Sequence, residues 1–334
     1  MKTQRLTTDK SGIIKACEIL KDGGIVAIPT ETVYGLAASA YNPNAISKIF
    51  KAKGRPQDNP LIVHISNIEV LKEIAKDIPK NVYILAQKFW PGPLTMVLNK
   101  TDNIPPCVSA GLSTVAVRMP SNPIAQEVIS VSGLPLAAPS ANLSGSPSPT
   151  TANHVLNDLD GKIDAVIMGE DCNVGVESTV ISLTGEHPVL LRPGGVTLEE
   201  LREILPDITV DKAVLSELKS GEKASSPGMK YKHYAPKTET FLVEGDSFAE
   251  FVNTKENAVA VCFLEESENI KIPKIVYGSG ATPESLAQNI FATLREVDSM
   301  GANAVYIHAP EKSGIGLAVY NRLIRAAAFK VIKL

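Results

Sequence analysis

Positively charged side chains are concentrated in one short segment of the sequence, and their spacing could bind an anion. Lys51, Lys53 and Arg55 fall within five residues at the predicted end of a helix, and Pro56 fixes the backbone after Arg55. They could simply be solvated at the helix C-terminus, where the helix dipole favours cations. They could equally form a clamp for a phosphate or carboxylate, because arginine offers a two-pronged donor and lysine a point charge.

A second candidate is an arginine inside an apolar strand. Arg118 is the charged residue in the run 115–119, whose other members are Val, Ala and Met. Burying a guanidinium costs free energy unless an anion pairs with it. That anion could be a structural Asp or Glu, or it could be the carboxylate of a substrate.

Polar side chains also follow predicted strands, at the edge where α/β sheets bind ligands. Thr30 and Thr32 follow the apolar run 25–28, where they either stabilise a turn or orient a small polar ligand. Ser140 and Asn142 follow the run 134–138, and their spacing of two puts both side chains on one face of extended backbone. The segment 226–236 combines aromatic and basic residues, which predicts a segment that closes over a cleft.

The elements that must position these residues alternate between helical and strand patterns. Helices are predicted at 9–22, 44–53, 68–76, 81–89, 248–253, 283–300 and 316–329. Strands are predicted at 25–28, 61–65, 94–98, 115–119, 165–168, 179–183, 189–191, 240–243, 258–263, 275–277 and 305–307. Because the crossovers are irregular, the pattern predicts a mixed α/β sheet and not a regular doubly wound one.

The length of 334 residues predicts about two domains, at roughly 100–200 residues per domain. Residues 219–228 are small, charged or turn-forming, which is typical of a linker. We therefore predict a first domain at 1–210, a linker at 211–237 and a small α/β domain at 238–334.

Composition excludes several classes of protein. The 33 Lys and Arg against 36 Asp and Glu give a net charge of −3, which excludes a surface that is basic throughout but not a local basic cleft. No apolar run approaches the ~20 residues of a membrane span, and no secretory signal is visible. Four scattered cysteines and isolated histidines predict reduced thiols and no protein-held metal. We expect a cytoplasmic protein with no membrane partner.

Several sequence blocks, in this order, resemble the YrdC family of L-threonylcarbamoyladenylate synthases in its long, two-domain form. They are PTETVYGL at 29–36, KGRP with NPL at 53–61, VAVRMP at 115–120, PSAN at 139–142, VEST at 176–179, LRPGG at 191–195 and SPGMKYKHYAP at 226–236. The resemblance spans almost the whole chain. It implies a YrdC-type mixed, twisted-sheet catalytic domain, a linker that folds over the active site, and a small C-terminal Rossmann-like α/β domain.

The resemblance also implies a reaction, in which L-threonine, bicarbonate and ATP give threonylcarbamoyl-AMP and pyrophosphate. The catalytic residues it implies are Lys53 and Arg55. The implied threonine-binding residues are Thr32, His64, Arg118, Ala138 and Ser178. The implied ATP-binding residues are Arg55, Asn59, Thr114, Ser140, Asn142, Ser148, Arg192 and Tyr231. Mg²⁺ is implied as a companion of ATP and not as a metal held by the protein.

The implied product passes to a downstream transferase that modifies adenosine 37 of tRNA, so that tRNA itself is only an indirect partner. The main alternative is a non-enzymatic RNA-binding or regulatory module that uses the same basic cleft. Another carbamoyl- or adenylyl-transferring enzyme of related fold is a second alternative. Arginines among Thr, Ser and Asn at strand ends favour a small ligand over a nucleic-acid groove.

Overall fold

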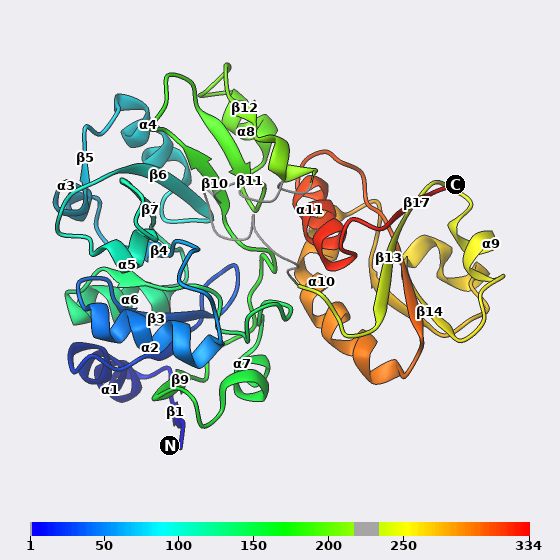
Figure 1. The fold of residues 1–334 in the computed structure, drawn as a ribbon, viewed down its shortest axis with the longest axis horizontal. Helices are drawn as coiled ribbons and strands as arrows, with labels where there is room; N and C mark the ends of the chain where they lie inside the picture. The colour runs from blue at the N-terminus through cyan, green and yellow to red at the C-terminus, as the bar shows by residue number, and fades with distance from the viewer. Residues whose placement is uncertain (1, 217–233) are drawn as a thin grey trace.

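Two β-sheets organise the chain, and each belongs to its own lobe (Figure 1). The computed structural model describes residues 2–216 and 234–334, which we call the N-terminal and C-terminal lobes. The helices of eight or more residues are α1 (Lys10–Lys21), α2 (Pro43–Lys53), α4 (Lys80–Phe89), α6 (Pro123–Ser132), α7 (Ala152–Leu159), α10 (Pro283–Val297) and α11 (Gly316–Ala326). The shorter ones are α3 (Leu71–Ile74), α5 (Pro106–Ser109), α8 (Leu198–Arg202) and α9 (Phe248–Val252).

The N-terminal lobe is built on a mixed sheet with the strand order β1-β9-β2-β3-β8-β4-β7-β6-β10-β11-β12, to which β5 adds beside β6. These strands are β1 (Gln4–Leu6), β2 (Val26–Ile28), β3 (Gly35–Ser39), β4 (Ile62–His64), β5 (Ala75–Lys76), β6 (Leu94–Lys100), β7 (Thr114–Arg118), β8 (Leu136–Ala137), β9 (Ala165–Ile167), β10 (Thr179–Ser182), β11 (Val189–Arg192) and β12 (Thr209–Val210). Parallel and antiparallel pairs alternate irregularly, as the sequence predicts.

Strand β2 shows how the apolar runs position this sheet. Val26 and Ile28 pack into a core that includes residues of α1 and α6. Ala27 packs into the larger core, which includes residues of α2 and α4. A run without alternating polar residues is expected where both faces of a strand are buried. The predicted buried strand at 25–28 is therefore confirmed, and the sheet lies between two helical layers.

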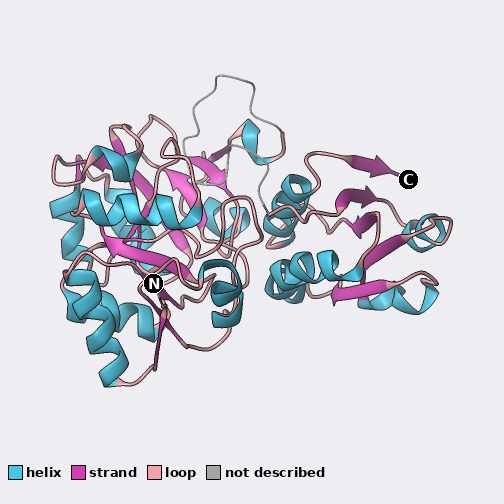
Figure 2. Ribbon diagram, turned by 60° about the horizontal axis from the view of Figure 1, so that its bottom comes forward, coloured by secondary structure: helices cyan, strands magenta, loops and turns pink. Residues whose placement is uncertain are grey.

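The C-terminal lobe contains a smaller, wholly parallel sheet with the strand order β15-β14-β16-β13-β17. Its strands are β13 (Glu239–Glu244), β14 (Ala258–Phe263), β15 (Lys274–Gly278), β16 (Ala304–His308) and β17 (Val331–Lys333). Helices α10 and α11 pack on this sheet and lie on the side that faces the N-terminal lobe (Figures 1 and 2). The predicted fold class, a mixed α/β lobe followed by a small Rossmann-like one, is confirmed.

Several local predictions are wrong or incomplete, and three of them show why. The predicted helix at 68–76 ends at Ile74, because Ala75 and Lys76 pair with β6 instead. Strand β3 was not predicted, since Gly35–Ser39 contains no β-branched residue and is held by pairing with β2 and β8. Helix α6 was also missed, although Asn122 caps it and Pro123 begins it, which is a recognisable start signal.

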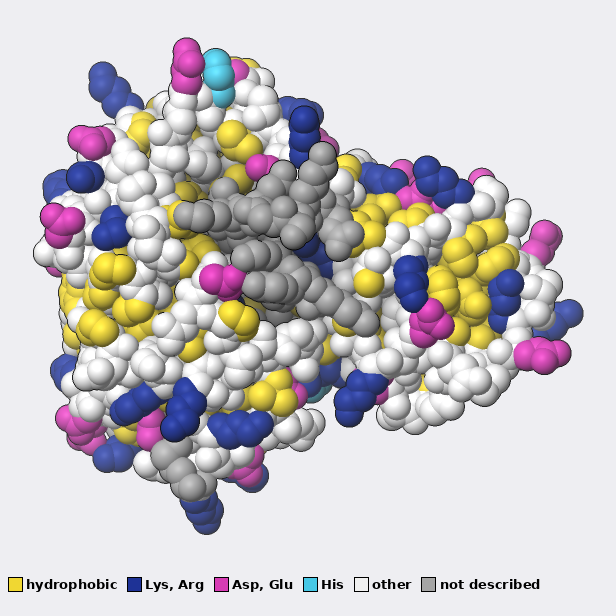
Figure 3. Space-filling model, in the orientation of Figure 1, with side chains coloured by type: hydrophobic (Ala, Val, Ile, Leu, Met, Phe, Trp, Pro, Cys, Tyr) yellow, Lys and Arg dark blue, Asp and Glu magenta, His cyan; other side chains and the backbone are white. Residues whose placement is uncertain are grey.

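The surface agrees with the near-balanced charge of the chain. Figure 3 shows basic and acidic side chains interspersed over the face in view. Within residues 2–216 and 234–334, no helix is both long and apolar enough to span a membrane.

Candidate functional site

The functional candidates meet at one cavity, which is lined by residues of the N-terminal lobe and by Tyr234. Of the predicted site residues, those that line it are Thr32, Lys53, Arg55, His64, Arg118, Ala138, Ser140, Asn142, Ser178 and Arg192. His64 and Arg118 end the parallel strands β4 and β7, where they are paired in register. Lys53 ends α2, and Arg192 ends β11. The cavity therefore collects strand and helix ends, the location that the sequence predicts.

Arg118 is buried at this cavity and is held by three contacts. Its Nη2 lies 2.7 Å from Glu31 Oε1, its Nη1 donates to Thr32 Oγ1 (2.9 Å), and its Nε donates to the Gly92 carbonyl (3.3 Å). Of the two anionic partners that the sequence left open, the structure supplies an acidic side chain, Glu31. Burial opposes the ionisation of Glu31, but Arg118 outweighs it and lowers the pKa of the carboxyl. The contacts use three of the five guanidinium N–H donors.

His64 is buried beside Arg118. Burial and the neighbouring Arg118 lower the pKa of His64 to about 3. The imidazole is therefore neutral at pH 7, and its Nδ1 lies 3.3 Å from the Ile62 carbonyl. A neutral imidazole can orient a ligand by hydrogen bonding without adding a second positive charge to this end of the cavity.

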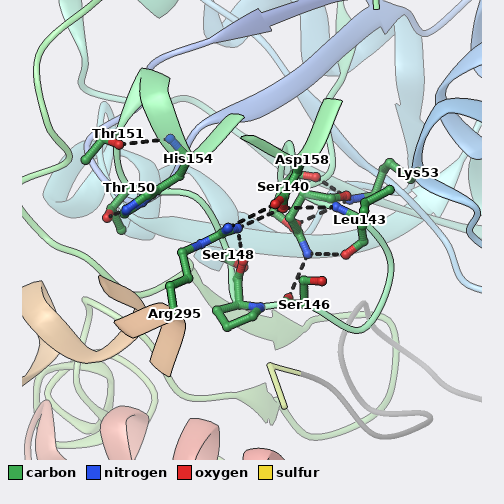
Figure 4. A network of polar contacts seen from close by, with 12 residues as sticks. Lys53, Ser140, Leu143, Ser146, Ser148, Thr150, Thr151, His154, Asp158 and Arg295 are labelled. Carbon is green, nitrogen blue, oxygen red and sulfur yellow. Dashed lines mark hydrogen bonds and ion pairs between the residues drawn. The ribbon is translucent and has the colours of Figure 1, made fainter. Parts of the chain in front are cut away.

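Lys53 is buried and fastens the turn at 140–142 (Figure 4). Its Nζ donates to the carbonyls of Ser140 and Asn142, the latter at 2.6 Å, and lies 3.3 Å from Asn142 Oδ1. Ser140 Oγ also donates to Asn142 Oδ1 (2.6 Å), so the Asn142 side-chain amide contacts both Lys53 and Ser140. Burial and nearby Arg55 lower the pKa of Lys53, whereas the three oxygen acceptors match the three donors of an ammonium. Lys53 thus shapes the wall of the cavity as well as lining it.

Two further arginines add positive charge to the cavity. Arg192 is buried, and its Nε and Nη2 donate to the carbonyl and Oγ of Ser178 (3.0 and 3.1 Å). Arg55 donates through Nη2 to the carbonyls of Asn59 and Pro60, each at 3.3 Å. Burial and the charge of Arg192 lower the pKa of Arg55 to about 10, and burial and the charge of Arg322 lower the pKa of Arg192 to about 10, so both stay charged at pH 7. Two cations held close together favour a polyanionic ligand.

Three of the predicted residues that the structure describes do not line the cavity. Asn59 is buried behind Arg55, and Ser148 is buried and donates to Glu177 Oε1 (2.6 Å). Thr114 begins β7, roughly 13 Å from Arg118 at ~3.3 Å per residue. Tyr231 lies outside the described residues, as does most of the linker predicted to fold over the site. Contacts of these four residues with ATP remain predictions.

Three residues of the site were missed by sequence reasoning. Glu31 pairs with Arg118, and Glu177 and Tyr234 line the cavity. All three lie inside the sequence blocks that drew attention, but none was assigned a role. Glu177 carried the same signal as Arg118, a charged residue beside an apolar strand. Its partner is Arg322 of the C-terminal lobe, whose Nε lies 2.7 Å from Glu177 Oε2.

The fold and the cavity together define a two-lobed α/β protein with a buried, positively charged pocket for small anionic ligands. Its cations are fixed by neighbouring carbonyls, hydroxyls and carboxylates, so the pocket is preorganised. Comparison with known proteins identifies the class more closely.

Two family models match the chain in succession. Residues 18–194 match the Sua5_yciO_yrdC family, described as "Telomere recombination", and residues 196–328 match "Threonylcarbamoyl-AMP synthase, C-terminal domain". The chain is 46% identical to the threonylcarbamoyl-AMP synthase of Pyrococcus abyssi, over 95% of this chain and 94% of the relative. It is 43% identical to that of Bacillus subtilis, over 99% and 97%. The crystal structure of P. abyssi Sua5 complexed with L-threonine superposes with a TM-score of 0.91 at 42% identity, covering 100% of both chains.

The chain belongs to the two-domain threonylcarbamoyl-AMP synthases of the Sua5/YciO/YrdC family. The resemblance noted in the sequence blocks is thereby confirmed.

Proposed function

We propose that this chain catalyses the reaction of L-threonine, bicarbonate and ATP to give threonylcarbamoyl-AMP and pyrophosphate. The names of relatives that match nearly the whole chain support this activity, as does the threonine complex of the P. abyssi protein. The observation that carries the proposal is the set of buried cations around one cavity, Lys53, Arg118 and Arg192 with Arg55 beside them. This set fits two anionic substrates, a carboxylate and a triphosphate.

Threonine is proposed to bind at the end of the cavity where Arg118 lies. The guanidinium has N–H donors beyond those that contact Glu31, Thr32 and Gly92, and these would bind the threonine carboxylate. Neutral His64, with Ala138 and Ser178, would enclose the rest of the amino acid.

ATP is proposed to bind at the opposite end, where Arg55 and Arg192 would face its phosphates. Ser140 and Asn142, held by Lys53, would contact the same nucleotide, and Tyr231 and the linker would close the site. Mg²⁺ would bind together with ATP, coordinated by the phosphate oxygens of the nucleotide, which are ligands of the kind that it prefers. Within the described residues, no group of three His, Cys, Asp or Glu side chains lies where it could hold a metal instead.

The reaction needs no covalent intermediate on the protein. Deprotonated threonine amine and bicarbonate give a carbamate and water, and a carbamate oxygen then attacks the α-phosphorus of ATP and displaces pyrophosphate. The carbamate is labile in water, so a pocket that excludes solvent protects it. Lys53, Arg55 and Arg192 would act by positioning and by stabilising negative charge, which is how phosphoryl-type transfers are generally catalysed.

The product is proposed to serve as the substrate of a downstream transferase that modifies adenosine 37 of tRNA, so that tRNA meets the product and not this surface. The proposed location is the cytoplasm. The four cysteines are unpaired thiols, as expected in a reducing compartment.

Burial of the cations distinguishes this function from RNA binding through the same cleft. Lys53, Arg118 and Arg192 are only 2%, 4% and 7% exposed, so a polymer backbone could not reach them without opening the lobe. The test is pyrophosphate release from ATP by the full chain. We expect turnover only when threonine and bicarbonate are both present. Turnover without threonine, or RNA binding without any turnover, would contradict the proposal.

A further inference from the structure

Helices α10 and α11 of the C-terminal lobe place two arginines against the walls of the cavity. Arg322 is fully buried and pairs with Glu177, which lines the cavity, at 2.7 Å. Arg295 donates to both carboxylate oxygens of Asp158 in the N-terminal lobe, at 3.0 and 2.8 Å. The Arg322–Glu177 pair is buried, and buried charges are tolerated only with their partners in place, so the two lobes are held in a defined arrangement.

Glu177 connects Arg322 to the part of the cavity proposed to bind ATP. Its Oε1 accepts a hydrogen bond from Ser148 (2.6 Å) and its Oε2 one from Arg322. The next residue, Ser178, accepts two hydrogen bonds from Arg192. Arg192 is also the other cation that acts on the Glu177 carboxylate. Without Arg322, this carboxylate would be drawn toward Arg192 and would neutralise a charge that ATP needs.

Arg295 reaches the opposite wall by a chain of hydrogen bonds (Figure 4). Besides Asp158, it donates to the Pro147 carbonyl at 2.5 Å. Asp158 accepts from the Leu143 backbone at 3.3 Å, and the Ser146 carbonyl accepts from Asn142 Nδ2 at 2.8 Å. Asn142 in turn holds Lys53. Arg295 thus stabilises the segment 143–147, which in turn contacts the turn at 140–142.

We propose that Arg322, with Arg295 as a second clamp, is a positioning residue for the ATP end of the cavity, and that the C-terminal lobe is a fixed part of the nucleotide site. The proposal rests on the proposed function for the identity of the nucleotide. Neither arginine lines the cavity itself, so each acts through a residue of the N-terminal lobe. Arg118, which is proposed to bind the threonine carboxylate, is held by Glu31 and has no described contact with the C-terminal lobe.

The test compares full-length variants by two measurements. The first is the binding of a non-hydrolysable ATP analogue and of L-threonine by calorimetry, and the second is the KM for ATP and kcat of pyrophosphate release. Arg322→Met is expected to weaken analogue binding at least tenfold and to lower kcat/KM for ATP about 10²-fold, as a displacement near 1 Å does. Threonine affinity should fall much less than analogue affinity, because Arg118, the proposed ligand of the threonine carboxylate, is held by Glu31 and not through Arg322. Arg322→Lys should recover part of the loss, because it keeps a cation beside Glu177.

A double variant tests whether Arg322 acts through Glu177. The variant combining Arg322→Met with Glu177→Gln should bind the analogue no more weakly than Arg322→Met alone, because the carboxylate that would neutralise Arg192 is gone. Gln288→Ala is the matched interface control, since Gln288 Nε2 donates across the same interface to the Asn173 carbonyl (2.8 Å) but reaches neither wall. Its analogue affinity should be unchanged.

Three results would overturn the inference: unchanged analogue binding by Arg322→Met, losses that simply add in the double variant, or an equal loss in Gln288→Ala. If Arg322→Met does not fold, Arg295→Met on the partly exposed pair with Asp158 gives the same comparison of ATP analogue against threonine. Absence of turnover in the unmodified chain would count against the proposed function. The analogue measurement would still decide whether Arg322 positions the site.

Discussion

Replacing Arg118 by methionine removes a guanidinium and keeps an unbranched side chain. Arg118 is 4% exposed and Glu31 is 6% exposed, with 2.7 Å between the paired atoms. The variant therefore leaves a buried carboxylate without its cation, which costs about 3–5 kcal/mol of unfolding free energy. It also removes the charge-assisted hydrogen bond to the threonine carboxylate, worth about 1.5–3 kcal/mol. At about 1.4 kcal/mol per factor of ten, threonine affinity should fall roughly 10- to 100-fold.

Two measurements on two variants, Arg118→Met and its combination with Glu31→Gln, separate these effects. Urea unfolding should show that Glu31→Gln combined with Arg118→Met regains at least half of the stability lost by Arg118→Met alone, because no buried charge is left unpaired. Calorimetry should show weak threonine binding in both variants that lack Arg118. The reasoning fails if Arg118→Met keeps the stability and threonine affinity of the unmodified chain, or if the double variant is no more stable than the single one.

Three further predictions concern the walls of the cavity. Lys53→Met frees the Asn142 turn and should cut pyrophosphate release at least tenfold; unchanged turnover would exclude Lys53 from the site. Gly194→Ala would place a Cβ 2.3 Å from a backbone nitrogen, so its melting temperature should fall, whereas Gly185→Ala, with its nearest neighbour at 3.6 Å, should match the unmodified chain. Burial opposes ionisation of Glu177, but Arg322 and Arg192 lower its pKa from 4.5 to about 2. The ionised, paired Glu177 carboxylate therefore contributes about 3 kcal/mol to the unfolding free energy, fully above pH 5 and less and less as the pH falls toward 2. The unfolding free energy of Glu177→Gln, measured in urea, should depend less on pH in this acid range than that of the unmodified chain. An unchanged pH dependence would contradict the pairing.

The sequence predicted those parts of the fold that depend on local pattern. The apolar run 25–28 and the helix at 44–53 are recognisable because burial and capping leave a signature within a few residues. Strand β3 left no such signature, because its pairing with β2 and β8 forms it. Residues 75–76 likewise became a strand through a partner in β6, more than twenty positions away.

In the site, too, single residues could be recognised from their neighbours in the sequence, but their partners, which lie far along the chain, could not. Arg118 stood out as a charge inside an apolar strand, but nothing near it in the sequence identified Glu31 as its partner. For Lys53 the sequence left open a solvated helix end or a clamp for a ligand; in the structure its Nζ is bound to the turn at 140–142, 87 and 89 residues away. Glu177 gained its partner from the other lobe, 145 residues along the chain. Such contacts become visible only once the sheets and lobes are assembled.

We propose that one cavity joins threonine, bicarbonate and ATP into a carbamoyl adenylate. Isotope-labelled bicarbonate tests it most directly, because the label must pass into a product that contains AMP. We expect label in an adenylate of threonine when the full chain, threonine, ATP and Mg²⁺ are present, and no label in an adenylate when threonine or ATP is omitted. Release of pyrophosphate without incorporation of the label would contradict the account.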